Sequence, residues 1–140
     1  NDSLGNAFAK NWLEIGASTP WCKKLPADFS NYGINQVDIF APGYQIYSST
    51  PDNNYEFFNG TSMASPVTAG LAALIWSYYP SLTAVQVKQC IMESGITHKN
   101  KVPVPGDGKK TVKARFTKLS VTGKVINAYN AVKLADKMSQ

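Results

Sequence analysis

A serine lies at the centre of the stretch of this sequence that is best suited to chemistry. Ser62 follows Gly60-Thr61 and precedes Met63-Ala64-Ser65-Pro66, which opens a run of small and apolar residues. This pattern is typical of a serine in the first turn of a helix, where backbone N–H groups lack intrahelical partners. A serine hydroxyl becomes an effective nucleophile beside a base, and the reaction needs donors for the oxyanion that forms. The start of the helix supplies such donors, so we predict that Ser62 is a nucleophile.

The base that such a serine needs is not evident in this chain. His98 is the only histidine; it follows Gly95 in a polar stretch, so we interpret it as a surface residue rather than as a general base. The alternative for Ser62 is an ordinary capping role, because serine is favoured at helix starts. If Ser62 is a nucleophile, the chain is one part of an enzyme whose base lies elsewhere.

The composition indicates a folded domain. The 140 residues are 44% hydrophobic and 16% charged, which fits one globular domain with a sizeable core. The chain begins at Asn1 without a basic leader, so we expect a fragment or a processed product. The longest apolar run, residues 67–79, has little more than half of the ~20 residues that a membrane span requires. We therefore expect a buried helix there and no membrane span.

The net charge of +5 raises the question of a nucleic-acid partner. Much of the positive excess lies between residues 99 and 124, where Phe116 is the only aromatic residue. Single-stranded nucleic acids bind to grooves in which aromatic side chains alternate with basic ones. The pattern therefore favours a solvated basic loop, and we predict no nucleic-acid partner.

Cys22 and Cys90 are far apart in the sequence and lack metal-ligand spacing. Their positions allow either a disulfide or two separate thiols. We favour two free thiols, because Cys90 falls on a helix face that can pack as a small apolar residue.

Apolar runs bounded by turn residues predict four strands, at residues 12–17, 37–41, 44–48 and 55–58. Helices are expected at 62–79, 84–94 and 127–137. The first is apolar all round and is expected inside the domain, the second carries a capping box of Thr83 and Gln86, and Asn127 caps the third. Residues 96–117 are rich in lysine, proline and glycine, which predicts a polar surface excursion.

The octet Asn59-Gly60-Thr61-Ser62-Met63-Ala64-Ser65-Pro66 strongly resembles the nucleophile motif of the subtilisin-like serine proteases, the subtilases. Further segments resemble successive parts of the same fold in the right order: residues 13–17, 29–33, 37–43 and 122–128. The resemblance implies an α/β fold, part of a doubly wound, mostly parallel sheet with flanking helices that is incomplete in this chain. Residues 1–140 would be the C-terminal portion of a catalytic domain.

The resemblance also implies roles for individual residues. The family uses a Ser-His-Asp triad in the chain order Asp, His, Ser, so both partners of Ser62 would lie upstream. The backbone N–H of Ser62 would be one oxyanion donor, with Thr61 beside the same site, and the asparagine donor would also lie upstream. Asn59, Phe58 and Phe29 would form the leaving-group side of the substrate cleft.

A metal site is not expected in this chain. Asp38 matches a position that holds a weak cation in some relatives, but Gln36 replaces the carboxylate expected nearby. We therefore predict no cofactor here and leave calcium open for the full-length parent.

We expect the parent to be an exported serine endopeptidase, periplasmic or secreted, that cleaves polypeptides by acyl transfer through Ser62, while the isolated chain is inactive. The alternative is a catalytically inactive subtilase-like module that binds peptides or partners. A small non-enzymatic α/β domain with a fortuitous motif is the third hypothesis. The expected partner is the N-terminal part of the same domain, or a second copy through self-association.

Overall fold

A four-stranded sheet forms the centre of the computed structural model, which describes residues 9–106 and 112–140. The strand order is β1 (Ile15–Ser18), β2 (Ile39–Pro42), β8 (Lys124–Val125) and β5 (Ile96–Thr97). β1, β2 and β8 run parallel, and β5 pairs with β8 in the antiparallel direction. The predicted α/β fold with a mostly parallel sheet is confirmed.

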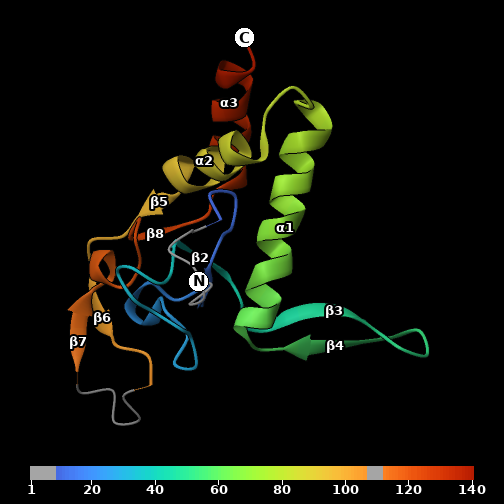
Figure 1. Cartoon of the computed structure of the whole chain (residues 1–140). Coiled ribbons are helices and arrows are strands. Elements are labelled where there is room, and N and C mark those ends of the chain that lie inside the picture. The colour runs from blue at the N-terminus through green and yellow to red at the C-terminus, as the bar shows by residue number, and fades with distance from the viewer. Residues whose placement is uncertain (1–8, 107–111) are drawn as a thin grey trace.

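Three helices flank the sheet: α1 (Thr61–Tyr78), α2 (Ala84–Ser94) and α3 (Ala128–Met138). Figure 1 shows α2 and α3 crossing near one end of the long helix α1. Side chains of all three helices and of β2 form the larger core, which includes Ile39, Leu71, Ile75, Val87, Ile91, Ala131 and Ala135. No helix among the described residues is long and apolar enough to cross a bilayer.

The predicted helix boundaries and caps are confirmed for α2 and α3. The Thr83 hydroxyl accepts a hydrogen bond from the Gln86 N–H at 3.3 Å, and Gln86 Oε1 accepts one from the Thr83 N–H at 2.8 Å. Asn127 Oδ1 accepts from the N–H of Asn130 at 2.8 Å. These local bonds satisfy N–H groups that have no partner inside the helix.

Two antiparallel hairpins lie outside the central sheet. β3 (Ile46–Thr50) and β4 (Asn54–Phe58) form one hairpin, which projects from the body beside the start of α1 in Figure 1. β6 (Lys101–Pro103) and β7 (Lys113–Arg115) form the other. Two short 3₁₀ helices complete the described structure, η1 (Cys22–Lys24) and η2 (Phe116–Lys118).

The segment 96–117 differs from the predicted polar surface excursion. Lys99, Lys101 and Lys113 are exposed as expected, but β5 joins the central sheet, and Val102 and Phe116 are fully buried. Val102 of β6 and Phe116 of η2 pack with Leu25 and Phe40 in a second core. Residues 107–111 of the predicted excursion lie outside the described residues.

The interpretation of α1 as a wholly buried helix is wrong for this chain. Ala64, Thr68, Leu71 and Ile75 are buried, whereas three large apolar side chains at other positions around the helix are exposed: Leu74, Trp76 and Tyr78. The sequence pattern predicts a helix with apolar residues on every side. The helices and strands that the structure describes cover only one side of it. The sheet likewise ends at β1.

The prediction of two free thiols is confirmed. Cys22 is exposed, and Cys90 is buried with its Sγ atom 3.5 Å from Sδ of Met138. Burial raises the pKa of the Cys90 thiol, and the nearby Glu93 carboxylate raises it further. Cys90 therefore acts as a neutral core residue.

The first turn of α1 packs unusually close to the sheet through small residues. Ala17 of β1, Ala41 of β2 and Ala64 of α1 are fully buried in one cluster. Gly43 follows β2 at the same point. A Cβ atom at this glycine would lie 2.7 Å from the Ala17 methyl and 2.7 Å from the carbonyl oxygen of Gly60. The helix can therefore approach the sheet only because Gly43 has no side chain.

Gly43→Ala should lower the free energy of unfolding of the chain by about 1–3 kcal/mol, because the added methyl group overpacks this contact. Gly70→Ala is the matched control. The site of Gly70 on α1 is open, so alanine should raise stability by about 0.5–1 kcal/mol through helix propensity. Urea unfolding followed by tryptophan fluorescence measures both, and equal or greater stability of Gly43→Ala would contradict the packing argument.

Candidate active site

Hydrogen bonds attach the turn before Ser62 to the carboxyl ends of two strands. The N–H of Gly60 donates to the carbonyl of Gly43 at 2.9 Å, and the N–H of Gly43 donates to the carbonyl of Ser18 at 3.1 Å. Ser18 ends β1, and Gly43 directly follows β2. The chain thus holds Ser62 at the C-terminal edge of the parallel strands, the edge at which α/β sheets bind ligands.

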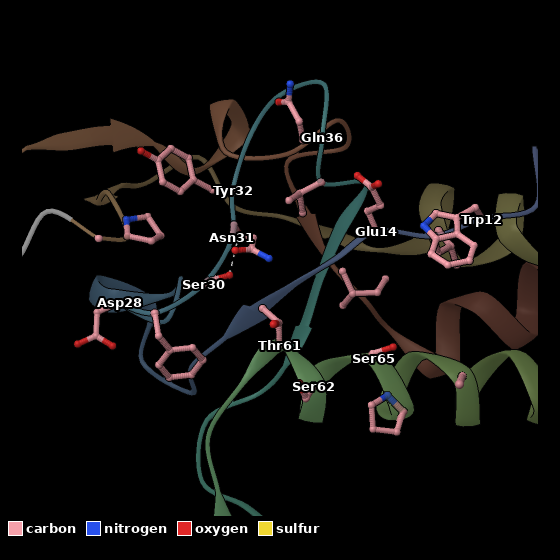
Figure 2. A pocket seen from close by; sticks show the side chains of 18 residues that line it. Trp12, Glu14, Asp28, Ser30, Asn31, Tyr32, Gln36, Thr61, Ser62 and Ser65 are labelled. Carbon is pink, nitrogen blue, oxygen red and sulfur yellow. Dashed lines mark hydrogen bonds between the residues drawn. The ribbon is translucent and has the colours of Figure 1, made fainter. Parts of the chain in front are cut away.

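The start of α1 presents backbone donors beside Ser62. The N–H groups of Met63 and Ala64 both donate to the carbonyl of Gly60, at 3.1 and 3.3 Å. The N–H groups of Thr61 and Ser62 have no acceptor among the residues that the structure describes. Ser62 is exposed, and Figure 2 shows it at the start of the helix. An exposed hydroxyl beside unpaired helical N–H groups can attack a carbonyl and stabilise the resulting oxyanion.

Pro66 lies beyond the first turn of α1. It is the sixth residue of the helix, and it has no N–H to donate to the carbonyl of Ser62. The helix tolerates it because α1 is long and packs firmly on the sheet on both sides of this position, at Ala64 and Leu71. The carbonyl of Ser62 is therefore released from the helical hydrogen-bond ladder.

A wide cavity of about 1220 Å³ lies over Ser62. Thr61, Ser62 and Ser65 line it from the start of α1, and residues 12–15 line it from the chain that enters β1. The loop 28–32 forms the opposite wall, and Figure 2 shows Asp28, Ser30, Asn31 and Tyr32 along it. The nucleophile candidate therefore faces open space that is large enough for a polypeptide or for another part of a domain.

The structure brings some of the predicted substrate-binding residues together with Ser62. Phe29 lines the same cavity and is 41% exposed. Asn59 does not line it; its Oδ1 atom accepts a hydrogen bond from the N–H of Gln45 at 2.6 Å and so fixes the base of the β3–β4 hairpin. Phe58 is exposed at the end of β4, outside the cavity. Their contacts with a substrate remain a prediction.

Ser30 positions the cavity wall, a role that sequence reasoning missed. It is buried, its hydroxyl oxygen accepts from the N–H of Ala17 at 2.8 Å, and its O–H donates to the carbonyl of Asn31 at 2.8 Å. These bonds attach the loop 28–32 to β1. The only signal for Ser30 in the sequence was its position within residues 29–33, one of the segments that resemble the subtilase fold.

His98 is half-buried rather than fully exposed. Its ring lies edge-to-face on Phe116, with the ring centroids 5.8 Å apart. It does not line the cavity over Ser62. This placement agrees with the interpretation that His98 is not the base. It differs from the predicted surface position only in that Phe116 covers part of the ring.

The Asp38 carboxylate bonds to groups of the chain itself. Its Oδ2 atom accepts from the N–H of Glu14 at 2.9 Å and lies 3.4 Å from Nζ of Lys88, which also donates to the carbonyl of Trp12 at 2.6 Å. Gln36 lines the cavity over Ser62. No group of three or more His, Cys, Asp or Glu side chains gathers within residues 9–106 and 112–140. Asp38 therefore connects α2, through Lys88, to the start of β1.

Asp38→Ala should lower the free energy of unfolding by about 1.5–3 kcal/mol, because a charged acceptor of a backbone N–H is lost. Lys88→Met is the control for the ion pair alone and should cost less than about 1 kcal/mol, since the pair is partly exposed. Calcium titration of the wild type and Asp38→Asn completes the test. Stabilisation of the wild type alone by calcium would identify Asp38 as a cation ligand and contradict the structural role.

Comparison with known proteins identifies the family of this architecture. A sequence model of the subtilase family matches residues 5–124. Subtilisin DY of Bacillus licheniformis is 53% identical over 65 residues, which are 46% of this chain and 23% of that protein. Alkaline elastase YaB of Bacillus sp. (strain YaB) is 50% identical over 92 residues, which are 63% of this chain and 24% of that protein.

Solved structures agree with the sequence comparison. The structure of the subtilase cytotoxin SubAB aligns with a TM-score of 0.68 and 26% identity, covering 91% of this chain and 37% of that chain. The patellamide maturation protease PatA aligns with a TM-score of 0.67 and 26% identity, covering 89% of this chain and 43% of that chain. The chain thus spans less than half of each of these relatives. It belongs to the subtilase family.

Proposed function

We propose that the parent protein of this chain is a serine endopeptidase and that Ser62 is its nucleophile. The observation that carries the proposal is the exposed Ser62 hydroxyl at the start of α1, beside unpaired N–H groups and open to a large cavity. Membership of the subtilase family and the identity to subtilisins support the same chemistry.

In the proposed reaction, Oγ of Ser62 attacks a peptide carbonyl and passes its proton to a histidine. The N–H of Ser62 stabilises the oxyanion, the amine leaves with the proton, and water then hydrolyses the acyl-enzyme. The histidine and its aspartate come from the remainder of the catalytic domain, because His98 lies against Phe116 away from the cavity. The mechanism needs no cofactor.

The wider setting is part of the proposal. The substrate is a polypeptide, and the parent is exported, as the resemblance to the Bacillus enzymes suggests. Asp38 makes a hydrogen bond and an ion pair within the chain, so we propose no cofactor here and leave calcium open for the parent.

Ser62→Ala in the parent should lower kcat by more than about a thousandfold, because the residual activity comes only from the oxyanion site and substrate binding. Ser77→Ala is the control, since Ser77 lies near the other end of α1 and donates to the carbonyl of Leu74. Peptide hydrolysis measures kcat for both variants.

Labelling with a fluorophosphonate probe should occur in the parent and not in the isolated chain. A parent that is not labelled would favour the inactive binding module, and prompt labelling of the isolated chain would require a base within it.

Exposed apolar side chains on α1 support a proposal about assembly. Leu74, Trp76 and Tyr78 are exposed at different positions around this helix, and β1 is an edge strand of the sheet within residues 9–106 and 112–140. Apolar surface and an unpaired strand edge of this kind are buried by a partner in stable proteins. We propose that the N-terminal part of the same domain covers them, and that the chain self-associates when this part is absent.

Light scattering on the purified chain should show species larger than a monomer, and co-expression with the upstream half of the parent should give a single one-to-one complex. The physical reason is the exposed apolar area of α1. A monodisperse monomer that unfolds cooperatively and binds no apolar dye would contradict the proposal.

A further inference from the structure

A second cavity lies next to the one over Ser62. It has a volume of about 390 Å³, within the range of small-molecule and side-chain pockets. Its walls are mainly aromatic and proline side chains, contributed by three separate segments: Trp21 and Pro26, Tyr44, and Pro103 and Pro105. We call this cavity the Trp21 pocket.

The aromatic wall of the Trp21 pocket has a defined geometry. The rings of Trp21 and Tyr44 meet edge-to-face, with centroids 5.1 Å apart and planes at 65°. The loop that carries Trp21 is fixed by Thr19, whose hydroxyl donates to the carbonyl of Lys24 at 2.7 Å and accepts from the N–H of Trp21 at 3.2 Å. The wall is therefore formed before any ligand binds.

The opposite wall belongs to the β6–β7 hairpin, which hydrogen bonds hold in place. The N–H of Gly106 donates to the carbonyl of Asp28 at 2.8 Å, and Val102 anchors the hairpin in the second core. Gly106 has a φ of +77°, a conformation that favours glycine. This hairpin therefore closes the pocket against the loop 28–32.

The Trp21 pocket and the cavity over Ser62 are neighbours that share part of their walls. Asp28, Phe29, Pro105 and Gly106 line both. A polypeptide that extends from Ser62 along this shared wall passes next to the Trp21 pocket, advancing about 3.3–3.6 Å with each extended residue. Phe29 is also the residue predicted to form the leaving-group side of the cleft.

We propose that the Trp21 pocket binds an aromatic side chain of the polypeptide substrate, within the first few residues after the scissile bond; this proposal rests on the proposed function. The aromatic and proline lining favours an aromatic occupant. Lys24 and Asp28 contribute one charge of each sign, which favours an uncharged side chain. The pocket would thus determine specificity on the leaving-group side.

The test uses the parent enzyme and fluorogenic peptides that differ only at the first, second or third residue after the cleaved bond. At one of these positions, phenylalanine should give kcat/KM at least about tenfold higher than alanine. Trp21→Ala should reduce this ratio to near one. Val104→Trp, which fills the pocket from the hairpin side, should reduce it as well and guards against a folding defect of Trp21→Ala.

Tyr129→Ala is the matched control, because Tyr129 is an exposed aromatic residue on α3 that lies outside the pocket. It should leave the ratio unchanged. A wild-type ratio near one at all three positions, or a ratio that survives both pocket variants, would overturn the inference. A methyl ester substrate carries no chain on the leaving-group side, so a wild type that fails to hydrolyse it would refute the proposed function instead.

Discussion

The close approach of α1 to the sheet is the constraint on which the rest of the structure depends. Ala17, Ala41 and Ala64 leave space for it, and Gly43 allows the backbone of Gly60 to come within hydrogen-bond distance. Larger side chains at these positions would lift the helix from the ends of β1 and β2. Ser62 would then lose its fixed orientation, and a displacement of about 1 Å is enough to lower catalytic rates strongly. The packing of these small side chains thus fixes the position of the proposed nucleophile.

Local signals made the helices predictable. The Thr83–Gln86 capping box and Asn127 each satisfy backbone donors within three residues, so the sequence contains the whole interaction. The residues that support the cavity and the second core were harder to predict from the sequence. Ser30 acts through Ala17, and the burial of Phe116 depends on Phe40, a residue far away in the sequence. Composition described the segment 96–117 correctly as basic, but it could not show which apolar residues face inward. The prediction that Ser62 is a nucleophile came from a motif whose residues are adjacent in the sequence.

The apolar pattern of α1 shows how a sequence can describe a larger assembly than the chain that carries it. A helix with apolar residues on all sides is stable only when it is covered on all sides. Here the sheet and α2 cover one side and leave Trp76 exposed, with its Nε1–H bonded to the carbonyl of Leu82. The strands of the central sheet have four residues or fewer, so the sheet alone offers little area to stabilise the helix. The pattern is therefore consistent with a chain that spans less than half of its structural relatives.

Different contacts hold Ser62 and the outer walls of the cavity in place. Ser62 depends on fully buried contacts, in which a single added carbon atom causes a clash. The walls beyond Phe29 depend on the loop that carries Trp21 and on the β6–β7 hairpin, which contacts the loop 28–32 through the bond between Gly106 and Asp28. The hairpin is anchored by Val102 in the second core, whereas the cluster of Ala17, Ala27, Ala41 and Ala64 contains no residue of this hairpin. Substitutions in the hairpin wall should therefore change the shape of the pocket at a smaller cost in stability than substitutions beneath the start of α1, because surface loops tolerate sequence changes that a close-packed contact does not.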